Sequence, residues 1–261
     1  MNRLTDHYDE VVKDATCRLL TYALNGNADF MGDDIHYASN HDFVGIEFSI
    51  HGMLDGRVRV GMPGKFNADN ALAALAVCTL ALSGGSGVLD DHTKQAILGS
   101  LVKVRVDGRM EIAHVSKTCS VIVDYAHNAV SMESLLTTLR DYHPKRLVCV
   151  FGCGGNRARD RRYSMGEIGG KMADLCIITA DNPRFEKNED IIKDIEVGLA
   201  KTDGTYLVIP DRREAIFYAI RNAEEGDMIA IIGKGHEDYQ EIEGVKHHFL
   251  DREVVEEAVK G

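Results

Sequence analysis

The clearest pattern in the chain is an alternation, in its C-terminal part, of short apolar runs with longer segments of mixed polarity. Apolar runs of about five residues between polar or glycine-rich breaks are typical of buried strands, and the segments between them have the length of helices. This alternation predicts an α/β domain with an open, mostly parallel sheet and helices on both faces. The expected strands are residues 120–124, 147–151, 175–179, 205–209 and 228–232, and the expected helices are residues 131–142, 164–172, 189–201 and 211–224, followed by a hairpin at 239–249 and a helix at 251–260.

The first hundred residues show a different order, with strands first and helices afterwards. Short apolar or alternating stretches between Gly, Asn and Asp clusters predict strands at 19–23, 35–38, 43–50 and 57–60. A helix should begin with Asn67 as its N-cap and end at Gly84-Gly85, and a second should cover residues 90–101. The apolar run 71–82 is shorter than the roughly 20 residues of a membrane-spanning helix, so it predicts a buried helix.

Composition narrows the class of protein. Acidic residues outnumber basic ones by 41 to 30, which gives a formal charge of −11. Phosphate backbones attract basic surfaces, so this balance argues against nucleic acid as a partner.

The residues after Met1 are polar and lack the apolar core of a signal peptide, which predicts a cytoplasmic protein without membrane insertion. The six cysteines form no CxxC pair, so we expect no metal site built on them.

Four of the expected parallel strands run directly into a polar cluster. In sheets of this kind, ligands bind beyond the carboxyl ends of the strands, so these loops are the candidate site. The clusters are Asp124-Tyr125-Ala126-His127-Asn128, Gly152-Cys153-Gly154-Gly155-Asn156-Arg157, Asp181-Asn182-Pro183-Arg184 and Gly233-Lys234-Gly235-His236-Glu237.

The cluster that starts at Gly152 is rich in glycine and then in arginine. Glycine lets the backbone approach a ligand closely, and guanidinium groups hold carboxylates or phosphates through paired hydrogen bonds. These residues predict an anion site, although a solvated loop whose arginines offset an acidic surface would have the same composition. Neither GxGxxG before a helix nor GxxxxGK[ST] is present, so no standard nucleotide motif is found here.

Two further clusters each allow two interpretations. Asn182 and Arg184 suit the ammonium and carboxylate groups of an amino acid, but the same sequence is a good Asx-Pro turn. Glu237 could pair with a cationic group of a substrate while Lys234 offsets negative charge, or the two glycines beside Lys234 could form a simple turn.

The cluster that begins at Asp124 also allows two interpretations. Asp124 and His127 could contact a nucleotide, or they could form a structural pair. The sequence contains no serine nucleophile elbow and no HExxH motif. A Ser–His–Asp hydrolase or a zinc peptidase is therefore disfavoured.

Taken in order along the chain, seven motifs resemble those of the Mur ligase family, and most closely those of its meso-diaminopimelate-adding members. Each motif alone is weak, but their order from about residue 60 to the C-terminus is specific. The motifs are Gly64-Lys65-Phe66-Asn67-Ala68-Asp69-Asn70, Gly108-Arg109-Met110-Glu111, Asp124-Tyr125-Ala126-His127, Phe151-Gly152-Cys153-Gly154-Gly155, Asp181-Asn182-Pro183-Arg184, Asp211-Arg212 and Gly233-Lys234-Gly235-His236-Glu237.

The resemblance implies an ATP-dependent ligase of peptidoglycan biosynthesis. In that family, ATP phosphorylates the D-glutamyl carboxylate of UDP-MurNAc-L-Ala-D-Glu, and an amine of the diamino acid attacks the acyl phosphate. The implied cofactors are ATP and Mg²⁺, and the implied partners are the UDP-MurNAc-dipeptide and meso-diaminopimelate. Residues 1–106 would be the C-terminal part of the central ATPase domain, and residues 107–261 the Rossmann-like, amino-acid-binding C-terminal domain.

The resemblance also implies the roles of ten residues. The nucleotide-binding positions are Asn67, Asn70, Arg109, Asp124 and His127, and the diamino-acid-binding positions are Arg162, Asn182, Arg184, Gly233 and Glu237. No catalytic residue and no metal ligand is assigned. The Asp-Asn-Pro-Arg motif favours meso-diaminopimelate over lysine, because lysine lacks the second carboxylate that an arginine fork would bind.

The chain also departs from the family pattern. Three positions differ from the residues usual in relatives: Asn156, Ala158 and Tyr163. The sequence also shows no phosphate loop, no magnesium-binding Glu and His segments and no carbamylated lysine. We therefore expect a truncated form that is not active alone, since phosphoryl transfer depends on phosphate and metal binding. The alternatives are a non-catalytic binding or interaction protein that retains the fold, and a lysine-adding ligase. The motifs at Asp181 and Gly233 disfavour another Mur-type ligase. The sequence does not determine the oligomeric state.

Overall fold

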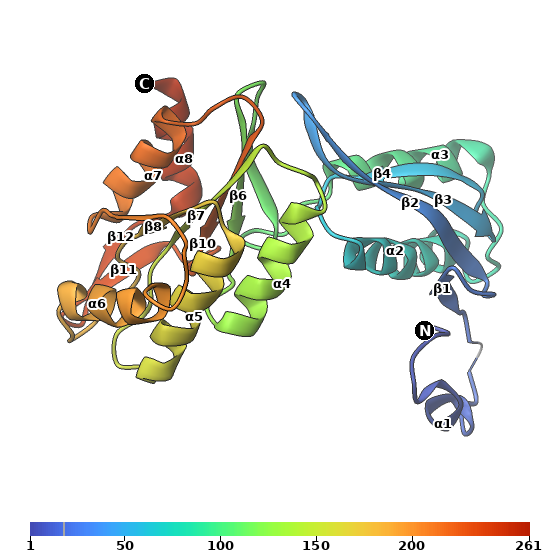
Figure 1. The fold of residues 1–261 in the computed structure, drawn as a ribbon. Coiled ribbons are helices and arrows are strands. Elements are labelled where there is room, and N and C mark those ends of the chain that lie inside the picture. Colours follow the sequence, from blue (N-terminus) through green and yellow to red (C-terminus); the bar gives the residue numbers. More distant parts are fainter. Residues whose placement is uncertain (18) are drawn as a thin grey trace. The chain divides into compact units, whose positions relative to one another are not determined.

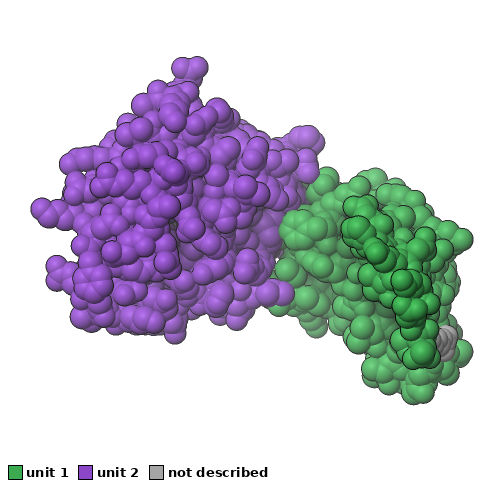
Figure 2. Space-filling view, turned by 90° about the horizontal axis from the view of Figure 1, so that it is seen from below, with its two compact units in different colours: residues 1–39, 43–105 green, residues 40–42, 106–261 purple. Residues whose placement is uncertain are grey.

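The computed structural model describes residues 1–17 and 19–261, which divide into two compact units. Unit 1 comprises residues 1–39 and 43–105, and unit 2 comprises residues 40–42 and 106–261 (Figure 2). Within the described residues, no helix has both the length and the apolar character needed to cross a bilayer.

Unit 1 contains a four-stranded sheet in the order β1-β2-β3-β4, in which β1 runs parallel to β2 and β3 antiparallel to β4. Its core joins β2 and β3 to α2, through buried side chains such as Phe30, Phe48 and Leu72. The strands are β1 (Tyr22–Leu24), β2 (Phe30–Asn40), β3 (Phe43–Gly52) and β4 (Gly56–Val60), and the helices are α1 (Tyr8–Val12), α2 (Phe66–Leu82), α3 (Asp91–Ser100) and a 3₁₀ turn at Leu101–Lys103.

Helix α2 corrects two predictions. It begins at Phe66, and the Asn67 side chain donates to the Pro63 carbonyl at 2.6 Å, so Asn67 lies inside the first turn and is not the N-cap. The helix is also not buried all round, because Val77 is 67% exposed and Leu82 59% exposed. The apolar run determined that a helix forms, but it could not show which of its faces would be covered.

Unit 2 is built on a six-stranded sheet in the order β5-β6-β10-β7-β8-β9. Strands β6 to β10 are mutually parallel, and β5 pairs antiparallel with β6. The prediction of a doubly wound, mostly parallel sheet is confirmed. The strands are β5 (Glu111–Val115), β6 (Cys119–Asp124), β7 (Arg146–Phe151), β8 (Leu175–Ile178), β9 (Tyr206–Val208) and β10 (Asp227–Ile232), with a separate hairpin of β11 (Tyr239–Ile242) and β12 (Val245–His248).

Helices cover both faces of this sheet (Figure 1). On one face, valine and isoleucine side chains of the central strands pack against α7 and α8. Val123 of β6, for example, shares one core cluster with Ile216 of α7 and Val255 of α8. Helices α4, α5 and α6 lie on the other face. The helices are α4 (Ala129–Arg140), α5 (Arg159–Met172), α6 (Asn188–Leu199), α7 (Arg212–Arg221) and α8 (Asp251–Lys260).

Helices α5 and α6 approach each other closely through glycines. A Cβ added to Gly166 would lie 2.1 Å from the Ile195 carbonyl oxygen, and one added to Gly198 would lie 2.0 Å from the Tyr163 carbonyl oxygen. Backbone atoms cannot yield as a flexible side chain can. The spacing of these two helices therefore depends on the absence of side chains at both positions.

We expect Gly166→Ala to lower the free energy of unfolding of unit 2. Alanine is favoured over glycine within a helix by about 0.5–1 kcal/mol. Overpacking against a backbone oxygen costs more, about 1–3 kcal/mol, so a net loss of about 1–2 kcal/mol should appear in urea unfolding. Gly99→Ala in α3 is the matched control, because its added Cβ meets nothing within 4 Å and should stabilise unit 1. Equal stabilisation by both variants would contradict the packing argument.

Candidate functional site

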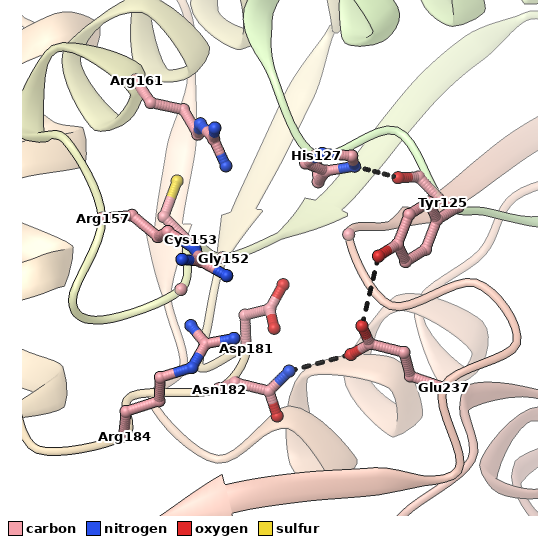
Figure 3. Close-up of a pocket in the computed structure, with 12 residues that line it drawn as sticks. Tyr125, His127, Gly152, Cys153, Arg157, Arg161, Asp181, Asn182, Arg184 and Glu237 are labelled. Atoms are coloured by element: carbon pink, nitrogen blue, oxygen red, sulfur yellow. Dashed lines mark hydrogen bonds between the residues drawn. The ribbon is translucent and has the colours of Figure 1, made fainter.

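The polar clusters that follow β6, β7, β8 and β10 line one pocket at the carboxyl edge of the unit 2 sheet (Figure 3). These four strands are neighbours in the sheet, although β10 comes last in the sequence. The pocket has a volume of about 270 Å³. It is lined by Tyr125, His127, Gly152, Cys153, Gly154, Arg157, Arg161, Asp181, Asn182, Arg184, Gly233 and Glu237.

The charges in this pocket are separated. Figure 3 shows Arg157, Arg161 and Arg184 along one side and Tyr125, His127 and Glu237 along the opposite side, with Asp181 between them. Among the described residues, no hydrogen bond reaches the Asp181 carboxylate, and burial raises the pKa of this group. The pocket therefore presents guanidinium donors on one side and carboxylate acceptors near the other, which is the pattern that a zwitterion requires.

Hydrogen bonds hold the Glu237 carboxylate at the pocket wall. Asn182 Nδ2 donates to Glu237 Oε2 at 2.9 Å, and the Tyr125 hydroxyl donates to Glu237 Oε1 at 3.3 Å (Figure 3). The Asn182 Oδ1 atom accepts from the Glu241 amide at 2.8 Å. Residues from two separate loops thus orient the Glu237 carboxylate, and the backbone of β11 in turn holds Asn182.

Arg184 borders the pocket from a strained turn. Its φ of 52° lies in the left-handed region, and its backbone is tied to the β11–β12 hairpin by a hydrogen bond to the Glu241 carbonyl at 3.0 Å. Its guanidinium donates to the Gly155 carbonyl at 2.8 Å and lies 3.3 Å from the Glu241 carboxylate. These two contacts use Nη1 and Nε, and among the described residues no hydrogen bond or ion pair uses Nη2.

The glycine loop after β7 packs directly on the loop after β8. A Cβ at Gly155 would lie 1.9 Å from the Pro183 carbonyl oxygen, and one at Gly152 would lie 2.2 Å from the Thr179 carbonyl oxygen. The Gly155 amide also donates to the Asn182 carbonyl at 2.9 Å. These glycines allow backbone-to-backbone contact, and that contact brings Arg157 and Arg184 to the same pocket.

The structure does not place Arg162 with the other predicted amino-acid contacts. Its side chain is 1% exposed and donates to Glu186 at 2.8 Å and to Asp194 at 2.9 Å. The hydrogen bond from Arg162 holds the pKa of Glu186 below its usual range. Arg162 lies on the buried face of α5 and ties this helix to α6, so the arginines at the pocket are Arg157 and Arg161 instead. The helical spacing of Arg162 with Met165, Gly166 and Gly169 is the sequence signal for that buried face.

Three of the predicted nucleotide positions belong to unit 2. His127 lines the pocket, and its Nδ1 lies 2.9 Å from the Tyr125 carbonyl oxygen. Asp124 is buried and accepts from the Met110 and Ala126 amides, both at 2.7 Å, and burial raises its pKa. The Arg109 guanidinium lies 5.0 Å from the centre of the Tyr125 ring. Asp124 and Arg109 thus support the pocket loop without lining the pocket.

The other two predicted nucleotide positions lie in the first turns of α2, in unit 1. Asn67 is 3% exposed, and Asn70 Nδ2 donates to Asn67 Oδ1 at 3.0 Å. The two amides thus form a pair in which Asn70 is the more exposed member.

The prediction of site residues missed several lining residues. Tyr125 lies two positions before His127 in the same cluster, Arg157 lies in the loop just before α5, and Arg161 lies in the first turn of that helix. Asp181 is part of the Asp-Asn-Pro-Arg motif but was not assigned. Among the described residues, no group of three or more His, Cys, Asp or Glu side chains is arranged to hold a metal ion.

Comparison with known proteins gives two family matches. The model of the Mur ligase middle domain matches residues 1–78, and the model of the Mur ligase glutamate ligase domain matches residues 108–235. Among curated proteins, UDP-N-acetylmuramoyl-L-alanyl-D-glutamate–2,6-diaminopimelate ligase 2 of Clostridium acetobutylicum is 40% identical over 250 residues, which is 95% of this chain and 49% of the relative. The ligase of the same description from Aquifex aeolicus is 42% identical and is matched over 91% of this chain and 45% of the relative. The chain thus spans about half the length of these curated relatives.

Solved structures agree with the sequence matches. A structure of a UDP-N-acetylmuramoyl-L-alanyl-D-glutamate–2,6-diaminopimelate ligase is 34% identical with a TM-score of 0.74, over 99% of this chain and 52% of the other. UDP-N-acetylmuramate-alanine ligase of Thermotoga maritima, at 16% identity, shares the fold with a TM-score of 0.59 over 92% of this chain and 47% of the other.

Proposed function

Because the chain belongs to the Mur ligase family, we propose that its unit 2 pocket binds meso-diaminopimelate as the amino acid joined in an ATP-dependent ligation. The observation that carries this proposal is the separation of charge in the pocket, with three arginines on one side, Glu237 on the opposite side and Asp181 between them. A diamino diacid has two ammonium and two carboxylate groups. It can therefore satisfy both sides of the pocket at once.

The second carboxylate is the basis for selectivity. Arg184 would bind one carboxylate through a forked pair of hydrogen bonds, with Arg157 and Arg161 near the same side, and Asp181 and Glu237 would receive ammonium groups. Lysine has only one carboxylate. Its binding would leave part of the guanidinium side without an anionic partner.

In the complete reaction that we propose, ATP transfers its γ-phosphoryl group to the D-glutamyl carboxylate of the UDP-MurNAc-dipeptide, and an amine of diaminopimelate displaces phosphate to form the amide. The residues of this chain would hold and orient the diamino acid. They do not supply the rest: the sequence has no phosphate loop, and the described part has no carboxylate or histidine cluster that fits Mg²⁺. We therefore propose that the 261-residue chain binds the amino acid but needs further elements for ligation.

Calorimetry of the purified chain tests this proposal. We expect meso-diaminopimelate to bind about 10- to 100-fold more tightly than L-lysine, since a charged hydrogen-bonded pair contributes about 1.5–3 kcal/mol. We expect no ADP from ATP and the UDP-MurNAc-dipeptide unless the missing half of a related ligase is added. Equal affinities for the two amino acids would remove the substrate assignment, and binding of neither would favour a non-catalytic interaction protein.

A further inference from the structure

Lys234 lies behind the pocket and is not one of its lining residues. Its side chain is fully buried, which is unusual for lysine because a charged group loses its hydration there. The ammonium donates to the Tyr239 carbonyl oxygen, lies 3.4 Å from Asn182 Oδ1 and lies 3.6 Å from Glu237 Oε2. Two of these three partners line the pocket.

These contacts determine how the Asn182 amide is oriented. Its Oδ1 faces two donors, the Lys234 ammonium and the Glu241 amide at 2.8 Å, while its Nδ2 faces the Glu237 carboxylate at 2.9 Å. In the flipped orientation, the amide NH₂ would face those two donors and the amide oxygen would face the carboxylate. All three contacts would then become unfavourable, so the lysine charge favours a single orientation.

The charges around Lys234 explain why it can stay buried. Desolvation lowers the pKa of its ammonium, whereas Asp181, Glu237 and Asp251 act to raise it and Arg212 acts to lower it. An unpaired ion in this position would be strongly unfavourable. The surrounding carboxylates therefore hold the ammonium, and the ammonium in turn offsets the carboxylate of Glu237.

We propose that Lys234 is a positioning residue of the amino-acid pocket, whose buried ammonium fixes the Asn182 amide and holds the Glu237 carboxylate at the pocket wall. This inference rests on the proposed function for the identity of the ligand. The position of Glu237 depends on Asn182, Tyr125 and Lys234 together, and Lys234 is the cationic member of this set. Its effect on binding should therefore pass through Glu237.

The test uses the full chain and the variant Lys234→Met, which keeps an unbranched side chain but removes the charge. Lys246→Met is the matched control, because both lysines lie near the Tyr239 ring, with Nζ 5.4 Å from its centre for Lys234 and 3.9 Å for Lys246, but Lys246 is exposed. We expect calorimetric affinity for meso-diaminopimelate to fall on the order of tenfold in Lys234→Met and to change less than about twofold in Lys246→Met. Lys234→Gln, which keeps a donor without charge, is measured in parallel in case the methionine variant is not folded at the assay temperature.

A double-variant cycle separates positioning from general stability. In a Glu237→Gln background, Lys234→Met should lower the affinity for meso-diaminopimelate little further, because the Glu237 carboxylate through which Lys234 acts is already replaced. A merely structural lysine would reduce affinity by the same factor in both backgrounds, which would overturn the proposal. So would equal affinities of Lys234→Met and Lys246→Met.

Crystal structures of the two ligand-free lysine variants provide a readout that does not depend on the substrate. We expect the 2.9 Å contact between Asn182 Nδ2 and Glu237 Oε2 to be lost in Lys234→Met and kept in Lys246→Met. Its persistence in Lys234→Met would overturn the positioning role. Failure of the unaltered chain to bind meso-diaminopimelate would instead refute the proposed function, while the crystal structures would still decide the role of Lys234.

Discussion

Replacing Arg212 with alanine should lower the free energy of unfolding of unit 2 by about 3–5 kcal/mol, the effect expected when one partner of a buried ion pair is removed. Arg212 and Asp251 are both fully buried, and Nε and Nη2 of the arginine donate to the two carboxylate oxygens, each at 2.7 Å. The same guanidinium donates to the carbonyls of Ala180 and Ile232, at 3.2 and 3.1 Å. Arg212 therefore joins the ends of β8 and β10 to the start of α8, and its loss leaves a buried carboxylate without a partner.

Urea unfolding followed by circular dichroism measures this effect, with hydrogen exchange of the β6 and β10 amides to assign it to unit 2. Arg213→Ala is the control, because the neighbouring Arg213 pairs with Glu257 at the surface and should contribute at most about 1 kcal/mol. The double variant Arg212→Met/Asp251→Leu should recover most of the stability, since it removes both charges. A loss below about 1 kcal/mol in Arg212→Ala would show that this pair does not hold the sheet edge.

Replacing Arg184 with alanine should weaken the binding of meso-diaminopimelate by about 2–3 kcal/mol, or roughly 30- to 150-fold. In the proposed binding mode this guanidinium holds a carboxylate through two hydrogen bonds, and in the structure it lines the pocket and donates to the Gly155 carbonyl at 2.8 Å. Alanine and arginine are both strained at a φ of 52°, so the change removes the guanidinium without relieving the backbone. Selectivity against L-lysine should fall with affinity, because lysine lacks the carboxylate concerned.

Isothermal titration of both amino acids with three variants tests this prediction. Arg184→Lys should be intermediate, because lysine keeps the charge but loses the planar fork. Arg159→Ala is the control, since the Arg159 side chain is 67% exposed, lies 3.7 Å from Asp194 and does not line the pocket. Unchanged selectivity in Arg184→Ala would assign carboxylate recognition to Arg157 or Arg161 instead.

The unit 2 sheet could be predicted because its signal is local. Four of the five parallel strands, β6, β7, β8 and β10, are buried apolar runs, whereas β9 is apolar but exposed. Each helix between them has a polar side, so the order of elements follows from the sequence pattern. The polar clusters after the strands could be assigned to one site for a related reason: parallel strands present their carboxyl ends at the same edge of a sheet. Asn182, Arg184, Gly233 and Glu237 accordingly meet in one pocket.

The remaining features depend on contacts between distant segments. Arg161 and Arg162 are adjacent and chemically identical, yet one lines the pocket and the other is buried between Glu186 and Asp194. The helical spacing of Arg162 with the buried positions of α5 indicates which of the two is covered, but only the packing of α5 on α6 identifies its partners. The start of α2 differs from the prediction for a local reason, because the Asn67 side chain donates to the Pro63 carbonyl, four residues earlier, instead of capping the helix.

The glycine contacts between α5 and α6 have a consequence for how sequence variation in this protein is interpreted. Gly166 and Gly198 do not line the pocket, yet any side chain there meets backbone atoms at about 2 Å. A saturation-mutagenesis map should therefore show intolerance at these positions as severe as at ligand-binding residues. Selection for binding of a different amino acid would change the tolerated substitutions at Arg184 but not at the two glycines. Comparing two such selections thus separates positions that preserve helix spacing from positions that choose the substrate.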